Sequence, residues 1–137
     1  MKFDGIYTPV ITPHHDDGTI NHDALVAQIE YLIASGVHGL INGGSTGEYH
    51  AQSIEERKDM ASFVKEIVGD RLPLIIGTGA IRQPDSIAMA EHAAKIGAAG
   101  LLIGSPPYAV PTERENALNA LAIDRAADLP IMLYNYP

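Results

Sequence analysis

Cysteine is absent from this sequence, and so are long apolar runs. Without cysteine the chain can form neither a disulfide framework nor a zinc–thiolate site. No apolar stretch approaches the ~20 residues that cross a bilayer. The opening residues, MKFDGIYTPV, also lack the apolar core of a secretory signal. We therefore expect no membrane partner and a cytoplasmic protein.

Basic residues are few, and they are scattered along the chain. Nine Lys and Arg stand against 17 Asp and Glu, which gives a formal charge of −8 at pH 7. Binding to nucleic acid needs a clustered basic surface, so we expect no nucleic-acid partner. The 137 residues are 46% apolar and 19% charged, a composition typical of one globular domain.

Apolar runs rich in Ile, Val and Leu alternate with longer amphipathic stretches. The runs cover residues 5–13, 37–44, 72–79, 98–107 and 129–137, and each is typical of a strand buried on both faces. The stretches between them, residues 21–36, 53–70, 84–97 and 112–128, carry apolar residues at helical spacing. Asn21 is a plausible N-cap for the first helix, and Ser53 with Glu56 forms a capping-box pattern before the second.

Five strands that alternate with four helices predict βαβ units and a parallel sheet. A flavodoxin-like, doubly wound sheet of five strands suits the length, whereas a (β/α)8 barrel needs ~250 residues and would be about half present. Length alone therefore favours the doubly wound sheet. In both architectures ligands bind at the carboxyl ends of the strands, so the candidate site residues are expected there.

The most informative strand end is GGSTGE, residues 43–48. Its glycines, Gly44 and Gly47 among them, let the backbone approach a ligand closely, and successive amides can form an anion-binding nest. Ser45 and Thr46 add two hydroxyl donors. This set suits a small carboxylate, while a nucleotide phosphate fits less well because the P-loop lysine and a GxGxxG pattern are missing. The alternative is a tight turn with capping hydroxyls.

Two tyrosines at strand ends are candidates for proton transfer. Tyr108 follows the fourth run, and Tyr134 lies in LYNYP at the end of the fifth. A tyrosine hydroxyl both donates and accepts, so a chain of Tyr and Ser hydroxyls can pass a proton without a permanent charge. The alternative for either tyrosine is that it only anchors a loop.

The remaining polar clusters are weaker candidates. The His-His-Asp-Asp cluster at 14–17 offers metal-ligand chemistry, but it runs into Gly18 as a turn, so we expect no metal site. His50 lies just beyond the GSTGE loop and is a candidate to line a site. The charged run at 55–58 is interpreted as a solvated helix face.

Seven motifs, taken together, resemble one family. They are GIYTPVITP near the start, DDGTI before the first helix, GLINGGSTGE, an arginine in the helix that follows, LIIGTGA, PPY with Pro111 shortly after, and LPIMLYNYP. In this order and spacing they resemble the dihydrodipicolinate synthase and N-acetylneuraminate lyase family of pyruvate-dependent class I aldolases, along all 137 residues. The resemblance implies a (β/α)8 TIM barrel, and it reverses the preference based on length. Residues 1–137 would then supply the N-terminal portion of a single barrel domain, about half of it.

The chemistry that the resemblance implies is that of a Schiff-base lyase, similar to dihydrodipicolinate synthase, which condenses or cleaves a 2-keto acid such as pyruvate with an aldehyde. In this family a lysine at the end of the sixth strand forms an imine with the ketone of pyruvate. The protonated imine acidifies the methyl group and yields an enamine nucleophile. The GSTG loop resembles the one that holds the carboxylate of the keto acid. We expect no cofactor.

The resemblance also implies roles for individual residues. Tyr134 corresponds to the strand-five tyrosine that shuttles protons, and Ser45 to a hydroxyl that is threonine in typical synthases and serine in the neuraminate lyases. Thr46, with Gly44 and Gly47 beside it, corresponds to the carboxylate contacts. Tyr108 corresponds to a tyrosine that, in tetrameric synthases, reaches into the neighbouring subunit's site. We therefore expect a homo-oligomer, specifically a homotetramer.

The imine-forming lysine of the family has no counterpart in this sequence. The four lysines are Lys2, Lys58, Lys65 and Lys95, and none of them ends a predicted strand. We therefore expect the isolated 137-residue chain to be inactive. We also expect it to be the first portion of a polypeptide of roughly 300 residues, whose C-terminal half would complete the barrel.

Three other functions stay open at this point. Within the family, the chain could belong to a neuraminate or 2-keto-3-deoxy sugar acid aldolase. From another class, it could be a flavodoxin-like, non-catalytic binding module. The last alternative is a half-barrel that assembles with itself.

Overall fold

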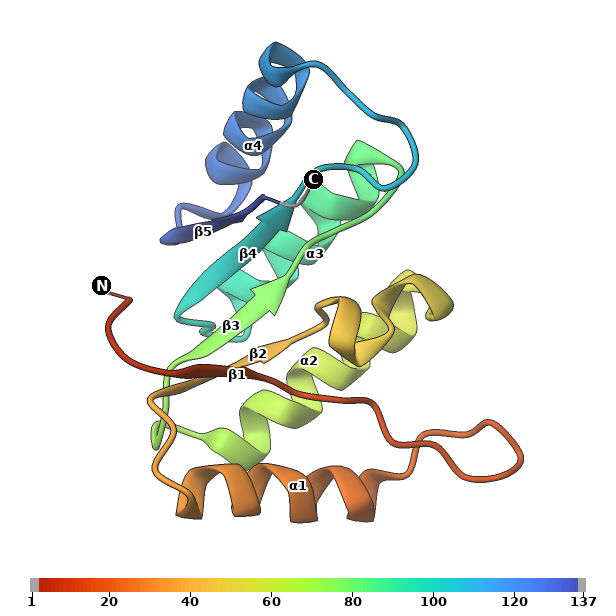
Figure 1. Ribbon diagram of the computed structural model, residues 1–137, viewed down its shortest axis with the longest axis vertical. Coiled ribbons are helices and arrows are strands. Elements are labelled where there is room, and N and C mark those ends of the chain that lie inside the picture. The colour runs from red at the N-terminus through yellow and green to blue at the C-terminus, as the bar shows by residue number, and fades with distance from the viewer. Residues whose placement is uncertain (1–2, 136–137) are drawn as a thin grey trace.

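The five strands form one parallel sheet in which the order in space is the order in sequence (Figure 1). The computed structural model describes residues 3–135. The strands are β1 (Tyr7–Pro9), β2 (Gly39–Asn42), β3 (Leu74–Gly77), β4 (Gly100–Gly104) and β5 (Ile131–Tyr134). Each lies within the apolar run that predicted it, and Tyr136 and Pro137 of the fifth run fall outside the described residues.

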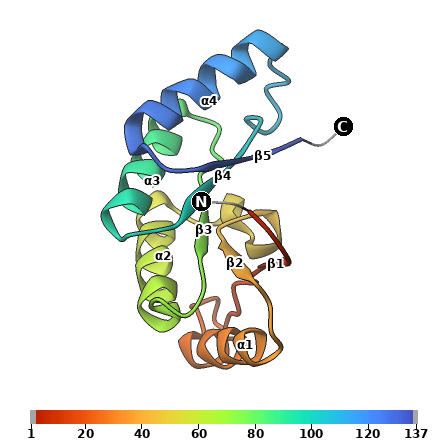
Figure 2. The ribbon, with the colours of Figure 1, turned by 90° about the vertical axis from the view of Figure 1, so that its left-hand side faces the viewer.

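Four helices connect the strands and lie on one side of the sheet. They are α1 (His22–Ala34), α2 (Ile54–Val68), α3 (Gln83–Lys95) and α4 (Glu113–Ala127). Figure 2 shows them following one another in an arc around the outside of the sheet. Two short 3-10 turns, η1 (Ser45–Gly47) and η2 (Tyr49–Ala51), lie between β2 and α2.

The helices begin where the sequence provides caps. The Asn21 side chain accepts from the amide of Ala24 at 3.0 Å, which starts α1. Complete capping boxes start α2, from Ser53 and Glu56, and α4, from Thr112 and Glu115. The predicted caps of the first two helices are therefore confirmed.

The core lies between the sheet and its helices. β2 and β3 are buried along their whole length, as expected for central parallel strands. The prediction that every strand is buried on both faces is wrong for β1, where no residue is buried, and for β5, where Leu133 is 68% exposed. The physical reason is position: within the described residues, β1 and β5 each have a neighbouring strand on one side only.

The strand order decides between the two architectures. A doubly wound sheet reverses direction at a switch point, whereas the order β1-β2-β3-β4-β5 continues in one direction. The sheet is thus a half-barrel of five strands and four helices, and the flavodoxin-like alternative is excluded. Within residues 3–135, every helix is too short or too polar to span a bilayer.

The cluster at 14–17 forms the predicted turn. The amide of Gly18, at φ +86°, donates to the carbonyl of His15 at 2.9 Å. The Asp17 carboxylate accepts from the hydroxyl and the amide of Thr19, and these hydrogen bonds lower the pKa of that carboxyl. Asp17 is therefore used to close the turn.

Candidate active site

The loop after β2 folds into a tight turn at the carboxyl end of the sheet. The amide of Gly47 donates to the carbonyl of Gly44, and that of Glu48 to the carbonyl of Ser45, both at 3.0 Å. The turn ends at Glu48, which adopts a left-handed conformation with φ 56°. Within residues 3–135, this leaves the amides of Ser45 and Thr46 available to a ligand, next to their hydroxyls.

The turn is also tied to the end of the first strand. The Thr12 hydroxyl donates to the carbonyl of Gly47 at 2.7 Å, and the Gln52 side-chain amide donates to the same carbonyl at 3.1 Å. Two donors on one carbonyl fix the orientation of that peptide. Gly47 is accordingly buried, whereas Ser45 and Thr46 of the same turn are exposed.

A cavity of about 490 Å³ opens beside this turn, at the carboxyl ends of the strands. Its walls come from all five strands and the loops that follow them: Pro9, Ile41, Gly43, Gly44, Ser45, Thr46, Tyr49, His50, Gly77, Gly79, Leu102, Gly104, Ser105, Pro107, Met132 and Tyr134. Of the predicted site residues, the structure brings together Gly44, Ser45, Thr46 and Tyr134 around this cavity. His50 lines it too, as the sequence suggested.

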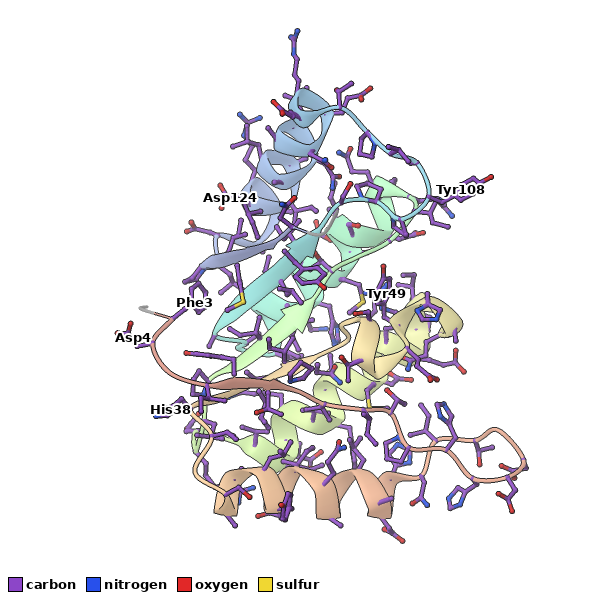
Figure 3. All side chains as sticks on the ribbon, in the orientation of Figure 1. Phe3, Asp4, His38, Tyr49, Tyr108 and Asp124 are labelled. Carbon is purple, nitrogen blue, oxygen red and sulfur yellow. The ribbon has the colours of Figure 1, made fainter. Side chains whose placement is uncertain are left out.

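The two tyrosines predicted for proton transfer are placed differently. Tyr134 ends β5 and lines the cavity with its side chain 52% exposed. Tyr108 is fully exposed, has φ +69°, and does not line the cavity. Figure 3 shows it projecting outward from the loop after β4. A role for Tyr108 within its own chain's cavity therefore has no structural support, and its predicted role across an interface stays a prediction.

The interpretation of residues 55–58 as a solvated helix face is wrong for Arg57. This side chain is only 4% exposed, because it points from α2 under the loops that line the cavity. Its guanidinium donates to the carbonyls of Gly79 at 2.8 Å and Gly77 at 3.0 Å. Burial lowers the pKa of the Arg57 guanidinium, and the neighbouring Tyr49 and Asp85 partly oppose this.

Helical spacing held the information that could have found Arg57. It precedes Met60 by three residues and Val64 by seven, so it lies on the same buried face of α2. Tyr49 was missed for another reason. Its ring lies 4.9 Å from the Arg57 guanidinium carbon and lines the cavity, but nothing in its sequence neighbourhood indicates this.

No lysine within residues 3–135 lies at the carboxyl end of a strand. Lys58 and Lys65 belong to α2, and Lys95 ends α3. Lys58 pairs with Glu55 on the helix surface. Lys65 donates to the carbonyl of Gly69. The described part of the chain thus presents hydroxyls and backbone amides to the cavity, and no amine.

A parallel half-barrel with a cavity at the carboxyl ends of its strands is typical of one class of protein, the (β/α)8 barrels. The model of the dihydrodipicolinate synthetase family matches residues 2–137. The chain belongs to this family.

Two curated relatives share a name. A 4-hydroxy-tetrahydrodipicolinate synthase from Acidiphilium cryptum is 36% identical over 135 residues, which are 98% of this chain and 46% of the relative. The synthase of the same name from Streptococcus pneumoniae is 40% identical over 134 residues, which are 96% of this chain and 43% of the relative. The chain therefore spans about half the length of the curated relatives it matches.

Solved structures agree with this assignment. YagE, a prophage protein of the dihydrodipicolinic acid synthase family from E. coli K12 in complex with pyruvate, superposes with a TM-score of 0.94 at 36% identity. The match covers 98% of this chain and 45% of YagE. CdNal from Clostridium difficile, in complex with mannosamine, gives a TM-score of 0.92 at 25% identity, over 100% of this chain and 48% of that one.

Proposed function

We propose that this chain forms the N-terminal portion of a TIM-barrel lyase that acts on pyruvate through a Schiff base, in the manner of dihydrodipicolinate synthase. One observation carries the proposal. The donors of Ser45 and Thr46 and the hydroxyl of Tyr134 border the same cavity at the strand ends. Membership of the dihydrodipicolinate synthetase family and a pyruvate-bound relative of the same fold support it.

The turn after β2 would hold the carboxylate of the keto acid. Among the described residues, no Arg or Lys lines the cavity, so the binding of an anion there rests on oriented backbone amides and hydroxyls. Gly44 allows the close approach, and Thr46 supplies the second hydroxyl contact. Gly47, predicted to bind substrate, is buried and does not line the cavity, so its role is to close the turn. A carboxylate held by this turn would direct its ketone toward the middle of the cavity.

Tyr134 would handle the protons of imine formation. A lysine amine, which we place in the part of the barrel beyond residue 135, attacks the ketone carbon and forms a C–N bond. The former carbonyl oxygen then leaves as water, and it needs two protons to do so: one is lost by the attacking amine nitrogen and one comes from solvent water. The Tyr134 hydroxyl passes these protons to the oxygen and is reprotonated through the Ser45 hydroxyl.

Tyr108 would act in a second copy of the protein. Its full exposure is compatible with the role across an interface that the family resemblance implies, and this supports a homo-oligomer. The aldehyde partner is a separate question. Ser45 favours a sugar acid aldolase within the family, whereas the names of the curated relatives favour the synthase, which we take as the leading assignment. The cytoplasm stays our predicted compartment.

Borohydride reduction in the presence of pyruvate tests the proposal. The complete gene product should gain a stable pyruvate adduct, measured by intact mass. Tyr134→Phe should slow adduct formation about a hundredfold, since it removes the group that transfers the proton. Tyr31→Phe, an exposed tyrosine of α1, is the matched control and should leave the rate unchanged. A folded wild-type protein that forms no adduct would refute the proposal.

A further inference from the structure

Arg57 is a buried cation whose partners are backbone carbonyls. Within residues 3–135, no carboxylate lies within ion-pair distance of it, and its Nε is buried without a hydrogen-bond partner. Burying a charge in this way is costly unless the group is well bonded. The two bonds that hold it end on the last residue of β3, Gly77, and on Gly79 in the segment that follows. The guanidinium therefore fixes that segment in place.

Through Gly77, Arg57 reaches the start of the carboxylate-binding turn. The backbones of Gly77 and Gly43 are in direct contact: a Cβ added to Gly77 would lie 2.2 Å from the Gly43 carbonyl oxygen and 3.1 Å from the Gly44 nitrogen. Gly43, at φ +76°, is the residue from which the turn departs. Holding the Gly77 carbonyl thus holds the peptide that leads into Ser45 and Thr46.

Through Tyr49, Arg57 also reaches the end of the same turn. Tyr49 directly follows Glu48, the left-handed residue that closes the turn, and its ring stacks on the guanidinium at 4.9 Å. The ring also packs against Gly79, where an added Cβ would lie 3.1 Å from the Tyr49 Cζ and hydroxyl oxygen. Figure 3 shows Tyr49 at the short helical turns beside the end of β3.

We propose that Arg57 and Tyr49 are positioning residues for pyruvate. Their contacts hold the turn Gly44–Gly47 at both ends and keep its amides and hydroxyls facing the cavity. This inference rests on the proposed function. It goes beyond it by assigning pyruvate affinity to two side chains that do not belong to the carboxylate-binding turn. Loosening either end lets the turn relax, so that the same donors bind the carboxylate less tightly.

The test is borohydride trapping of the complete gene product over a range of pyruvate concentrations. Arg57→Met keeps the length of the side chain but loses both hydrogen bonds, and the half-saturating pyruvate concentration should rise about tenfold or more. Arg57→Lys should give a rise of about threefold, because an ammonium keeps the charge without the planar fork. The final extent of trapping at saturating pyruvate should stay that of the wild type, since neither residue takes part in the chemistry.

Tyr49 provides the second, independent pair of variants. Tyr49→Leu removes the ring and should raise the half-saturating concentration about fivefold, whereas Tyr49→Phe keeps the ring over the guanidinium and should give a smaller rise. If Arg57→Met does not fold, the Tyr49 pair decides alone. Arg71→Met is the matched control, because Arg71 pairs with Glu30 on the surface and does not touch the turn. It should leave the half-saturating concentration unchanged.

The outcomes separate the two proposals. A wild-type protein without an adduct refutes the proposed function itself. A wild-type adduct, with Arg57→Met and Tyr49→Leu both saturating at the wild-type pyruvate concentration, overturns the positioning role. If Arg57→Met lowers the thermal midpoint but leaves the half-saturating pyruvate concentration unchanged, the positioning role is also overturned, because Arg57 then only stabilises the fold.

Discussion

The two sides of the candidate site differ in how firmly this chain builds them. On the side of β2 and β3, the turn that would take a carboxylate is held by Thr12, Gln52 and the buried Arg57. On the side of β4 and β5, Tyr134 is half exposed and Tyr108 fully exposed. The described residues therefore hold the turn that we propose for carboxylate binding by their own contacts. The side that we propose for proton transfer is exposed within these residues.

We expect the largest loss of stability from substitution of Gly77, which packs against the turn on the β2–β3 side of the site. In Gly77→Ala the new methyl group would meet the Gly43 carbonyl oxygen at 2.2 Å, so the backbone must shift. We expect a loss of about 3 kcal/mol in the free energy of unfolding, measured by denaturant titration of the complete gene product.

Gly44→Ala is the matched control for Gly77→Ala. Its methyl group would meet only the Leu102 side chain, at an ordinary 3.8 Å, so the loss should be about 0.5 kcal/mol. Equal losses for the two variants would contradict the close packing of β3 against the turn.

Leu133 tests the β4–β5 side of the site. Within residues 3–135, Leu133 is 68% exposed. If nothing else covered it, Leu133→Ala would change the free energy of unfolding only slightly. Because we propose that further strands of the barrel cover β5, we expect a loss of about 2 kcal/mol in the complete gene product. A loss below about 0.5 kcal/mol would show that nothing packs on this edge.

Acid should lower the stability of helices α2 and α4 together, with a smaller effect than the substitutions of Gly77 and Leu133. The capping hydrogen bonds from Ser53 and Thr112 lower the pKa of Glu56 and Glu115 below the ordinary 4.5. Their stabilising effect is complete above pH 4.5 and is lost as the pH falls through the lowered values. We therefore expect the thermal midpoint of the wild type to fall in that range.

Removing the two carboxylates tests this assignment. The double variant Glu56→Gln, Glu115→Gln should melt below the wild type at neutral pH, and the difference should shrink as the pH falls below 4.5. Glu55→Gln, one residue from Glu56, should keep the wild-type profile. A constant difference between the double variant and the wild type at all pH values would contradict the role of these carboxylates.

The same contrast explains what could be predicted from the sequence. Strict alternation of apolar runs and amphipathic stretches predicted the five strands and four α-helices, because each of these is decided by local pattern, but it did not predict the 3-10 turns η1 and η2. Length favoured the wrong architecture, since a half-barrel and a small doubly wound sheet share that pattern, and only the order of strand pairing separates them. The placement of Ser45, Thr46 and Tyr134 at one cavity followed from their positions at the ends of parallel strands.

Arg57 and Tyr49 could not be predicted in the same way. A charged run on a helix is usually solvated, and the carbonyls that bind Arg57 come from a segment 20 and 22 residues further along the chain. Helical spacing places Arg57 on the buried face of α2, but the partners that it binds there leave no local pattern. Tyr108 differs again, because within the described residues it is fully exposed and its predicted role needs a second subunit.

A crystal structure of the complete gene product with pyruvate tests the central claim most directly. We predict that the pyruvate carboxylate lies about 3 Å from the amides of Ser45 and Thr46, with its C2 joined to a lysine and the Tyr134 hydroxyl beside that bond. A carboxylate bound elsewhere in the barrel, with the turn after β2 empty, would contradict the account.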